Sequence, residues 1–302
     1  MKYIIKDSIL GTENEKVITQ KEYKQLKDAR KILAKGLAIE EKYDVLLSNY
    51  MDFENEILQI STEAMIYNQN GYDYFQIIIA RMNKRLINFL TASRLYIDHI
   101  KQHVNDLYPA IANEKSFVQV HCSNKYDRFL EYRFMEELRN YVQHCEFPIH
   151  HATVQNWKED NKKGSRDMIH SIDIFSLKSY LKEDDKFKKK ILSEIEEKVN
   201  LKTYVRKYVE CLSEVQAVIR NRVTNKLSEA RKLIEDQMVE HKKIYPKDSS
   251  ALIASSINSK GIVTDEFPLL LSWDDIRIDL EKKNRIMKNQ TRRYVSGQIK
   301  DA

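Results

Sequence analysis

Apolar residues return at helical spacing along most of the chain, and this pattern predicts long helices. Thr19, followed three positions later by Glu22, has the spacing of a reciprocal N-terminal cap, so we expect a helix to begin there. That helix should run toward Lys35, be interrupted near Gly36 and resume through residues 43–67, where apolar residues recur every three or four positions.

Two more helices are predicted in the first half of the chain. One begins at about Tyr72 and ends near Pro109, and it is so rich in apolar residues that it should pack on several sides. The other follows a short connector and should run from about Lys125 to Cys145, where Pro148 stops it.

The pattern changes after Pro148. Residues 149–157 and 168–176 are rich in β-branched side chains that roughly alternate with polar ones, and the polar stretch KEDNKKGSR separates them. This arrangement predicts a β-hairpin with a longish loop. Helices should return at about Phe187.

An uninterrupted apolar stripe between Leu201 and His241 predicts one long helix. The segment that follows, residues 248–268, is expected to be a loop with a short helix. A last helix should begin at Trp273, and the tail after about Gln290 should be solvated.

These elements predict a mainly α protein. Its expected parts are a helical bundle over residues 1–147, a β-hairpin connector over residues 148–182 and a C-terminal region with a long helix over residues 183–302. Only 6 Gly and 4 Pro occur in 302 residues, and this scarcity of chain breakers favours long helices over β-sandwiches and barrels.

The composition is that of a globular protein with a strongly charged surface, since 42% of residues are hydrophobic and 32% are charged. The formal net charge of +6 permits contact with a polyanion without requiring it. The apolar cluster near the N-terminus is too short for a secretory signal, and no run reaches membrane-spanning length, so we expect a cytoplasmic protein without membrane contact.

The sequence contains none of the usual cofactor signatures. Cys122, Cys145 and Cys211 lack the spacing of a zinc site and are expected to be reduced thiols. Walker, dinucleotide-binding and HExxH motifs are missing as well. We therefore expect no metal and no cofactor.

The helix expected around FMEELRNYVQH carries an unusual group of polar residues. At about 100° per residue, its apolar side chains fall on one arc. The opposite arc holds Glu136, Arg139, Asn140, Gln143 and His144. Asn140 and His144 are neighbours at i and i+4, and Arg139 lies one step around the helix, so a phosphate can contact all three.

Such a group suits RNA cleavage without a metal. A histidine with its ordinary pKa of about 6.5 exchanges protons at neutral pH. The arginine guanidinium offers several donors to phosphate oxygens and stabilises charge that develops at phosphorus. The nucleophile would be the 2′-OH of the substrate itself, and a cyclic phosphate end would result.

The stretch RNYVQH matches the R-x4-6-H motif of the HEPN superfamily, and it resembles that family also in the polar residue directly after the arginine. The resemblance covers this helix and the helices before it, roughly the first half of the chain. It implies a HEPN-like helical bundle and a metal-independent endoribonuclease acting on single-stranded RNA or tRNA. It further implies a homodimer whose two motif helices form one cleft, and a role as a toxin or an anti-phage defence effector.

By the same resemblance, Arg139 and His144 are the expected catalytic residues and Asn140 is their polar supporting residue. Gln143 and Glu136, on the same arc, are expected to bind the substrate. RLYIDH, with Arg94 and His99, repeats the spacing, but there Leu95 follows the arginine where the family places a polar group.

Other interpretations of these segments stay open. The polar arc is alternatively a solvated helix face with Glu136 paired to Arg139. The chain is alternatively a non-catalytic helical interaction or RNA-binding module that docks a partner through the stripe from Leu201 onward. A third possibility is a toxin silenced by an antitoxin of nucleotidyltransferase type, with Tyr141 as a candidate modification site. His99 and His103 have i,i+4 spacing but lack a third metal ligand.

A histidine pair and two basic runs could also contribute to an RNA site, although each has a simpler structural explanation. His150 and His151 follow the motif closely, but adjacent strand residues point to opposite faces, so at most one lines the cleft. The basic runs KFKKK, from Lys186, and NQTRRY, from Asn289, are candidate contacts to an RNA backbone or else solvated surface.

Overall fold

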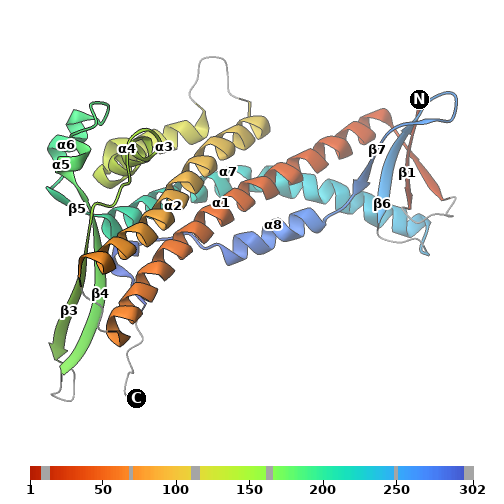
Figure 1. Ribbon diagram of the computed structural model, residues 1–302. Coiled ribbons are helices and arrows are strands. Elements are labelled where there is room, and N and C mark those ends of the chain that lie inside the picture. Colours follow the sequence, from red (N-terminus) through yellow and green to blue (C-terminus); the bar gives the residue numbers. More distant parts are fainter. Residues whose placement is uncertain (8–13, 68–70, 110–115, 161–165, 248–250, 296–302) are drawn as a thin grey trace. The chain divides into compact units, whose positions relative to one another are not determined.

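The computed structural model describes residues 1–7, 14–67, 71–109, 116–160, 166–247 and 251–295, and within them it contains eight α-helices and two small antiparallel sheets (Figure 1). The helices are α1 (Gln20–Ile66), α2 (Tyr72–Leu107), α3 (Phe117–Arg128), α4 (Leu130–His144), α5 (Lys178–Leu181), α6 (Lys189–Glu194), α7 (Leu201–Ile244) and α8 (Ser272–Lys283), with a short 3-10 helix at Gln290–Arg292. The strands are β1 (Lys2–Asp7), β2 (Glu15–Ile18), β3 (His151–Asp160), β4 (Arg166–Leu177), β5 (Lys198–Asn200), β6 (Leu252–Ile257) and β7 (Val263–Leu269). The prediction of a mainly α protein is confirmed at this level.

The chain folds into two compact units. Unit 1 comprises Met1–Lys42, His99–Glu114 and Val218–Arg285, and unit 2 comprises Tyr43–Asp98, Lys115–Ala217 and Ile286–Ala302. Because α1, α2 and α7 each contribute to both units, neither unit is a continuous stretch of sequence. The division at residues 147 and 182 that the sequence suggests stays a prediction.

The N-terminal cap of α1 is confirmed. The amide of Thr19 donates to Oε2 of Glu22 over 2.7 Å, and the amide of Glu22 donates to Oγ1 of Thr19 over 3.2 Å. Two free amides at the start of the helix are therefore satisfied reciprocally.

The predicted interruption near Gly36 is wrong, because α1 runs without a break for 47 residues. The glycine has a packing role instead. A Cβ atom at Gly36 would lie 2.5 Å from Cδ2 of Leu227, so a larger residue on α1 would require this side chain of α7 to shift. A single glycine costs a helix only about 1 kcal/mol, which does not end it.

The connector predicted before the motif helix is wrong as well, since it folds as α3. Ser116 caps this helix by accepting the amide of Gln119, and Phe129 then separates α3 from α4 with an extended backbone (φ −118°, ψ 121°). Only Val118 of α3 is buried. A helix with so little apolar surface gives almost no periodic signal, which explains why the pattern failed there.

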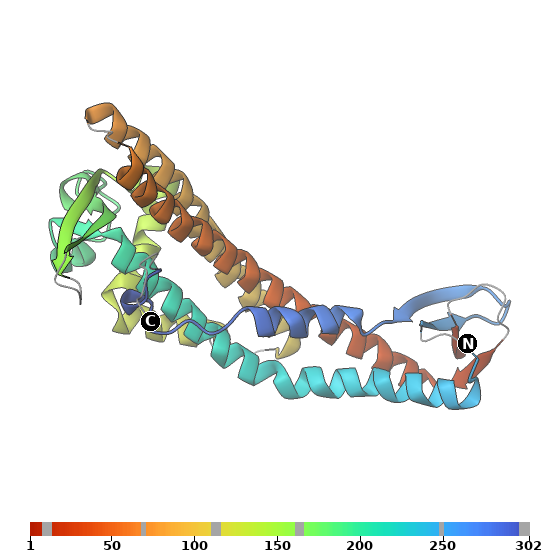
Figure 2. The same cartoon turned by 90° about the horizontal axis from the view of Figure 1, so that it is seen from below.

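The loop and short helix predicted for residues 248–268 are also wrong, because this segment contains β6 and β7. The two strands complete a four-stranded sheet of order β2-β1-β6-β7, in which Ile5 faces Ala254 across the central pair. Both views show this sheet beside the C-terminal end of α7 in unit 1 (Figures 1 and 2). The sheet therefore joins the first 18 residues to a segment that follows α7.

The predicted β-hairpin is present in unit 2. β3 and β4 pair antiparallel from His151 opposite Phe175 to Asp160 opposite Arg166, and β5 adds a short third strand. Residues 161–165 of the connecting loop lie outside the described residues. The predicted long helix is confirmed too, since α7 continues for 44 residues.

Candidate functional site on helix α4

The apolar arc of α4 anchors the helix in the core of unit 2. Phe134, Met135 and Leu138 are fully buried. The ring of Phe134 meets that of Tyr204 on α7 edge-on, with 5.0 Å between the ring centroids. This packing fixes the rotation of α4 about its axis and so decides which residues face outward.

The chain is held firmly where it leaves α4. Asn83 on α2 accepts the amide of Ile149 over 3.0 Å and donates to the carbonyl of the same residue over 3.3 Å. The next amide, that of His150, donates to the carbonyl of Phe175 at 3.0 Å. The segment just after the motif is thus pinned to both α2 and the hairpin.

Arg139 and Asn140 lie together at the middle of the polar arc. An Nη2 proton of Arg139 is donated to Oδ1 of Asn140 over 2.7 Å, and both side chains are half-buried. The Nε of Arg139 is buried and has no partner among the described residues, and no described carboxylate pairs with this guanidinium. Asn140 therefore holds one side of the guanidinium while leaving its charge uncompensated.

Gln143 and His144 are exposed on the last turn of α4. His144 ends the helix, about 6 Å along the axis from Asn140. The imidazole is thus open to solvent on the same side of the helix as Asn140.

Glu136 is tied to α7. Its Oε1 accepts a short hydrogen bond from the hydroxyl of Tyr208, a fully buried residue whose pKa is raised well above its usual range by burial and by this carboxylate. Instead of pairing with each other, Glu136 and Arg139 make their hydrogen bonds to Tyr208 and Asn140. Glu136 consequently stands at the inner edge of the arc, away from the exposed His144.

The two R-x4-H copies differ in the state of their arginine. Nε of Arg94 donates to Oδ2 of Asp98 at 2.5 Å, one helical turn further on, so its charge is neutralised locally. Arg139 has no such carboxylate within the described part of the chain. Only the RNYVQH copy therefore keeps a guanidinium charge for an external anion.

The contact between His150 and Tyr141 of the motif helix was not predicted from the sequence. The imidazole stacks on Tyr180, with ring centroids 4.6 Å apart, and meets Tyr141 edge-on. Its Nδ1 accepts the amide of Leu177 over 3.0 Å, so the neutral ring carries its proton on Nε2. Burial lowers the pKa of His150, which favours this neutral form. The sequence shows that His150 and His151 closely follow the motif, but it does not show that the chain folds back and places His150 against Tyr141 of α4.

Tyr141, the candidate modification site, is only 4% exposed. Burial, Glu146 and Cys145 together raise the pKa of its hydroxyl to about 12. Most of the Tyr141 side chain is therefore packed against its neighbours.

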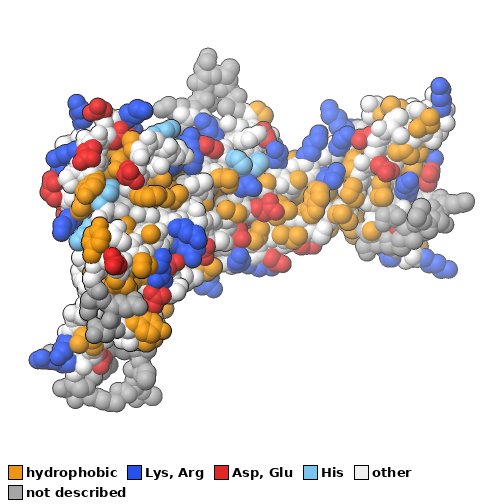
Figure 3. All heavy atoms as spheres, viewed as in Figure 1, with side chains coloured by type: hydrophobic (Ala, Val, Ile, Leu, Met, Phe, Trp, Pro, Cys, Tyr) orange, Lys and Arg blue, Asp and Glu red, His pale blue; other side chains and the backbone are white. Residues whose placement is uncertain are grey.

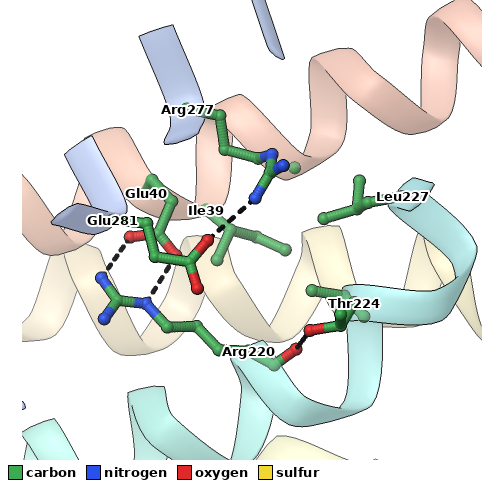
Figure 4. Close-up of a pocket in the computed structure, with 9 residues that line it drawn as sticks. Ile39, Glu40, Arg220, Thr224, Leu227, Arg277 and Glu281 are labelled. Carbon is green, nitrogen blue, oxygen red and sulfur yellow. Dashed lines mark hydrogen bonds and ion pairs between the residues drawn. The ribbon is translucent and has the colours of Figure 1, made fainter. Parts of the chain in front are cut away.

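A small pocket in unit 1 offers little for a ligand (Figure 4). It lies between α1, α7 and α8, and its two arginines, Arg220 and Arg277, are bonded to Glu40 and Glu281 respectively. The charges of both arginines are therefore bound to carboxylates of the protein itself.

The described residues contain no group of three or more His, Cys, Asp or Glu side chains placed to hold a metal ion. Nor does any helix in the described ranges combine the length and the apolar character needed to cross a membrane. Comparison with protein-family models, with curated proteins and with solved structures gives no match to this chain. The likeness to HEPN ribonucleases consequently rests on the motif residues alone.

Proposed function

We propose that this chain is a metal-independent endoribonuclease of HEPN type that cleaves single-stranded RNA or tRNA. The observation that carries the proposal is the pairing of an unneutralised Arg139, held by Asn140, with an exposed His144 one turn away on the same helix. These are the two groups that phosphodiester cleavage needs: a fixed positive charge and a titratable proton carrier.

In the proposed reaction, the 2′-oxygen of the substrate attacks the adjacent phosphorus while the bond from phosphorus to the 5′-oxygen breaks. The products are a 2′,3′-cyclic phosphate and a 5′-hydroxyl end. One group takes the proton from the 2′-hydroxyl and another gives a proton to the leaving oxygen, and His144 fills one of these roles. Arg139 stabilises the charge on the phosphoryl oxygens, and Asn140 keeps its guanidinium oriented.

A homodimer would complete the site. If two α4 helices meet about a twofold axis, His144 of each copy faces the other and supplies the second proton-transfer group. The exposed Gln143 would contact the sugar or a base next to the scissile phosphate, while Glu136 would act only from the inner edge of the arc. We place this activity in the cytoplasm, in a toxin or an anti-phage defence effector that an antitoxin or another defence-system partner restrains.

The test is RNA cleavage in excess chelator. Wild type should degrade total RNA, whereas His144→Ala and Arg139→Ala should each lose at least a hundredfold in rate, in keeping with the usual weight of a general acid or base. The matched control is His99→Ala, which removes the histidine of the second R-x4-H copy and should retain full activity.

Two results would overturn the proposal. One is intact RNA after incubation with the wild type. The other is equal cleavage by the wild type, His144→Ala and Arg139→Ala, which would indicate a contaminating nuclease.

The alternative of a docking module loses its proposed surface. Val205, Leu212, Val215, Ile219 and Leu227, from the apolar stripe of α7, are all at most 3% exposed within the chain itself. A stripe already used for the protein's own core is not available to a partner helix. This observation favours the polar arc of α4 as the functional surface.

A further inference from the structure

The basic run Lys186–Lys190 is fastened to the motif helix by its second residue, Phe187. Phe187 is 2% exposed, and its ring lies 6.2 Å, between centroids, from the rings of both Phe134 and Tyr141. Because the phenylalanine is buried against α4, the lysines on either side of it are forced to the surface around this anchor.

This anchor lies at the His144 edge of the polar arc. Tyr141 and His144 are three residues apart, which places them about 60° from each other around the helix. Desolvation is the largest cause that raises the pKa of the Cys145 thiol, and Asp184 raises this pKa further. Lys186 lowers it, so the ammonium group of Lys186 acts on the residue directly after His144. The basic run thus begins on the side of α4 that carries Tyr141 and Cys145.

One of the four lysines is already used in the fold. Nζ of Lys188 pairs with Glu137 at 2.9 Å and donates to the hydroxyl of Tyr126 over 3.1 Å. Lys186, Lys189 and Lys190 are exposed, and none pairs with a carboxylate of the described chain. They therefore present three uncompensated positive charges.

The local structure holds two of these charges outward. Lys189 and Lys190 form the first turn of α6, whose next two residues, Ile191 and Leu192, are buried. Three acidic residues precede the run: Oδ1 of Asp184 accepts the amide of Lys186 over 2.9 Å, while Glu183 and Asp185 are exposed. Figure 3 shows Lys and Arg side chains, with some Asp and Glu among them, over the region of α5 and α6.

We propose that Lys186, Lys189 and Lys190 form a subsite for the backbone phosphates of the RNA next to the linkage held by Arg139 and His144. The subsite rests on the proposed function, because its ligand is the substrate of that site. Lysine is a point charge on a long flexible stem, so the subsite would grip phosphates without reading bases, and it would extend the contact of the enzyme beyond a single linkage.

The experiment measures binding without cleavage. A fluorescein-labelled single-stranded RNA is titrated with full-length His144→Ala protein at several salt concentrations, and fluorescence anisotropy gives the affinity. Each phosphate contact to a single strand contributes about 0.7 to the slope of log affinity against log salt. Lys186→Gln, Lys189→Gln and Lys190→Gln together should therefore lower that slope by about 2.

A matched control removes the same amount of charge elsewhere. Lys21, Lys24 and Lys232 are exposed residues of unit 1, and their combined replacement by Gln should leave the slope unchanged. If the control triple lowers the slope as much as the Lys186–Lys190 triple, the effect is one of net charge and the subsite is overturned. An unchanged slope in the test triple, or no RNA binding by the parent protein, overturns it as well.

The outcome for the proposed function is read separately. If the wild type cleaves no RNA while the test triple alone loses the salt slope, the nuclease assignment fails and the phosphate subsite stands. If cleavage depends on His144 but the slope does not depend on the three lysines, the nuclease stands and the subsite fails.

Discussion

Glu40 on α1 and Arg220 on α7 form a buried two-pronged ion pair in unit 1. Nε and Nη2 of the arginine donate to the two carboxylate oxygens over 2.9 and 2.7 Å, and the side chains are only 4% and 11% exposed (Figure 4). The remaining donor, Nη1, bonds the carbonyl of Asn284 at 3.0 Å. One guanidinium thereby links α1 and α7 to the residue that ends α8.

Removing one partner of this pair should be far more damaging than removing both. Arg220→Met removes the guanidinium that binds both oxygens of the buried Glu40 carboxylate, and we expect a loss of about 3–5 kcal/mol in the free energy of unfolding. Arg220→Met combined with Glu40→Leu should recover most of that loss, because both members of the buried pair are then replaced by apolar side chains. Urea denaturation of the three proteins measures both effects, and a double variant no more stable than Arg220→Met would contradict the expectation.

Gly36 provides a second test of unit 1. Alanine has the better helix propensity by about 1 kcal/mol, but its Cβ would lie 2.5 Å from Cδ2 of Leu227 and 3.1 Å from Cδ of Arg277. We expect the clash to dominate, with a net destabilisation of about 1 kcal/mol, since overpacking typically costs 1–3 kcal/mol.

A double-variant cycle isolates that contact. Leu227→Ala removes the nearest atoms that a new Cβ would meet and leaves only the end of the flexible Arg277 side chain, so Gly36→Ala should stabilise the Leu227→Ala background instead of destabilising it. The same sign in both backgrounds, measured by thermal or urea unfolding, would show that the contact with Leu227 does not decide the choice of glycine.

The parts of the fold that the sequence predicts are those that local chemistry decides. The Thr19–Glu22 cap involves residues three apart, and the apolar stripe of α7 repeats every three or four positions along a helix of 44 residues. Both features can therefore be recognised from residues that are close in the sequence. The sheet of unit 1 is different. Ile5 and Ala254 face each other across the sheet although about 250 positions separate them, and no local pattern encodes such a partner.

The candidate site likewise has features that local sequence predicts and features that depend on the fold. The polar arc, from Arg139 to His144, follows from helical spacing alone, whereas the ion pair of Arg94 with Asp98, which also separates the two motif copies, was recognised only in the structure. The hydrogen bond from Arg139 to Asn140 depends on the rotamers that packing selects. The contact of His150 with Tyr141 depends on a chain reversal, which no periodicity describes.

The two hydrogen bonds of Asn83 to the backbone of Ile149 clamp this segment to α2. They should contribute considerably more to the free energy of unfolding than an ordinary surface contact does. Asn83→Ala removes both partners of a buried peptide group, and we expect a loss of about 2–3 kcal/mol in stability. Hydrogen exchange of the Ile149 amide should speed up selectively, because its acceptor is gone. Asn88→Ala, an exposed change on the same helix, should stay within about 0.5 kcal/mol of the wild type. Equal losses from both changes would show that the clamp contributes nothing.

His150 should make stability depend on pH. Its pKa is lowered in the folded protein, chiefly by burial, while Glu146 opposes the shift, so the unfolded chain binds this proton more readily than the folded one. The contribution of His150 is therefore complete above its unfolded pKa of about 6.5 and declines as the pH falls below that value. Protonation also turns Nδ1 from the acceptor of the Leu177 amide into a donor facing it.

The substitution His150→Asn separates the effect of protonating His150 from the effect of its packing. His150→Asn should destabilise the protein at pH 8 by on the order of 1 kcal/mol, because it loses the stacking on Tyr180 and weakens the bond to the Leu177 amide. At pH 5 the difference between wild type and variant should shrink, since only the wild type then pays to keep an imidazole neutral. Urea denaturation across this pH range tests the prediction, and a difference that is constant with pH would show that the folded state accommodates the protonated ring as easily as the unfolded chain does.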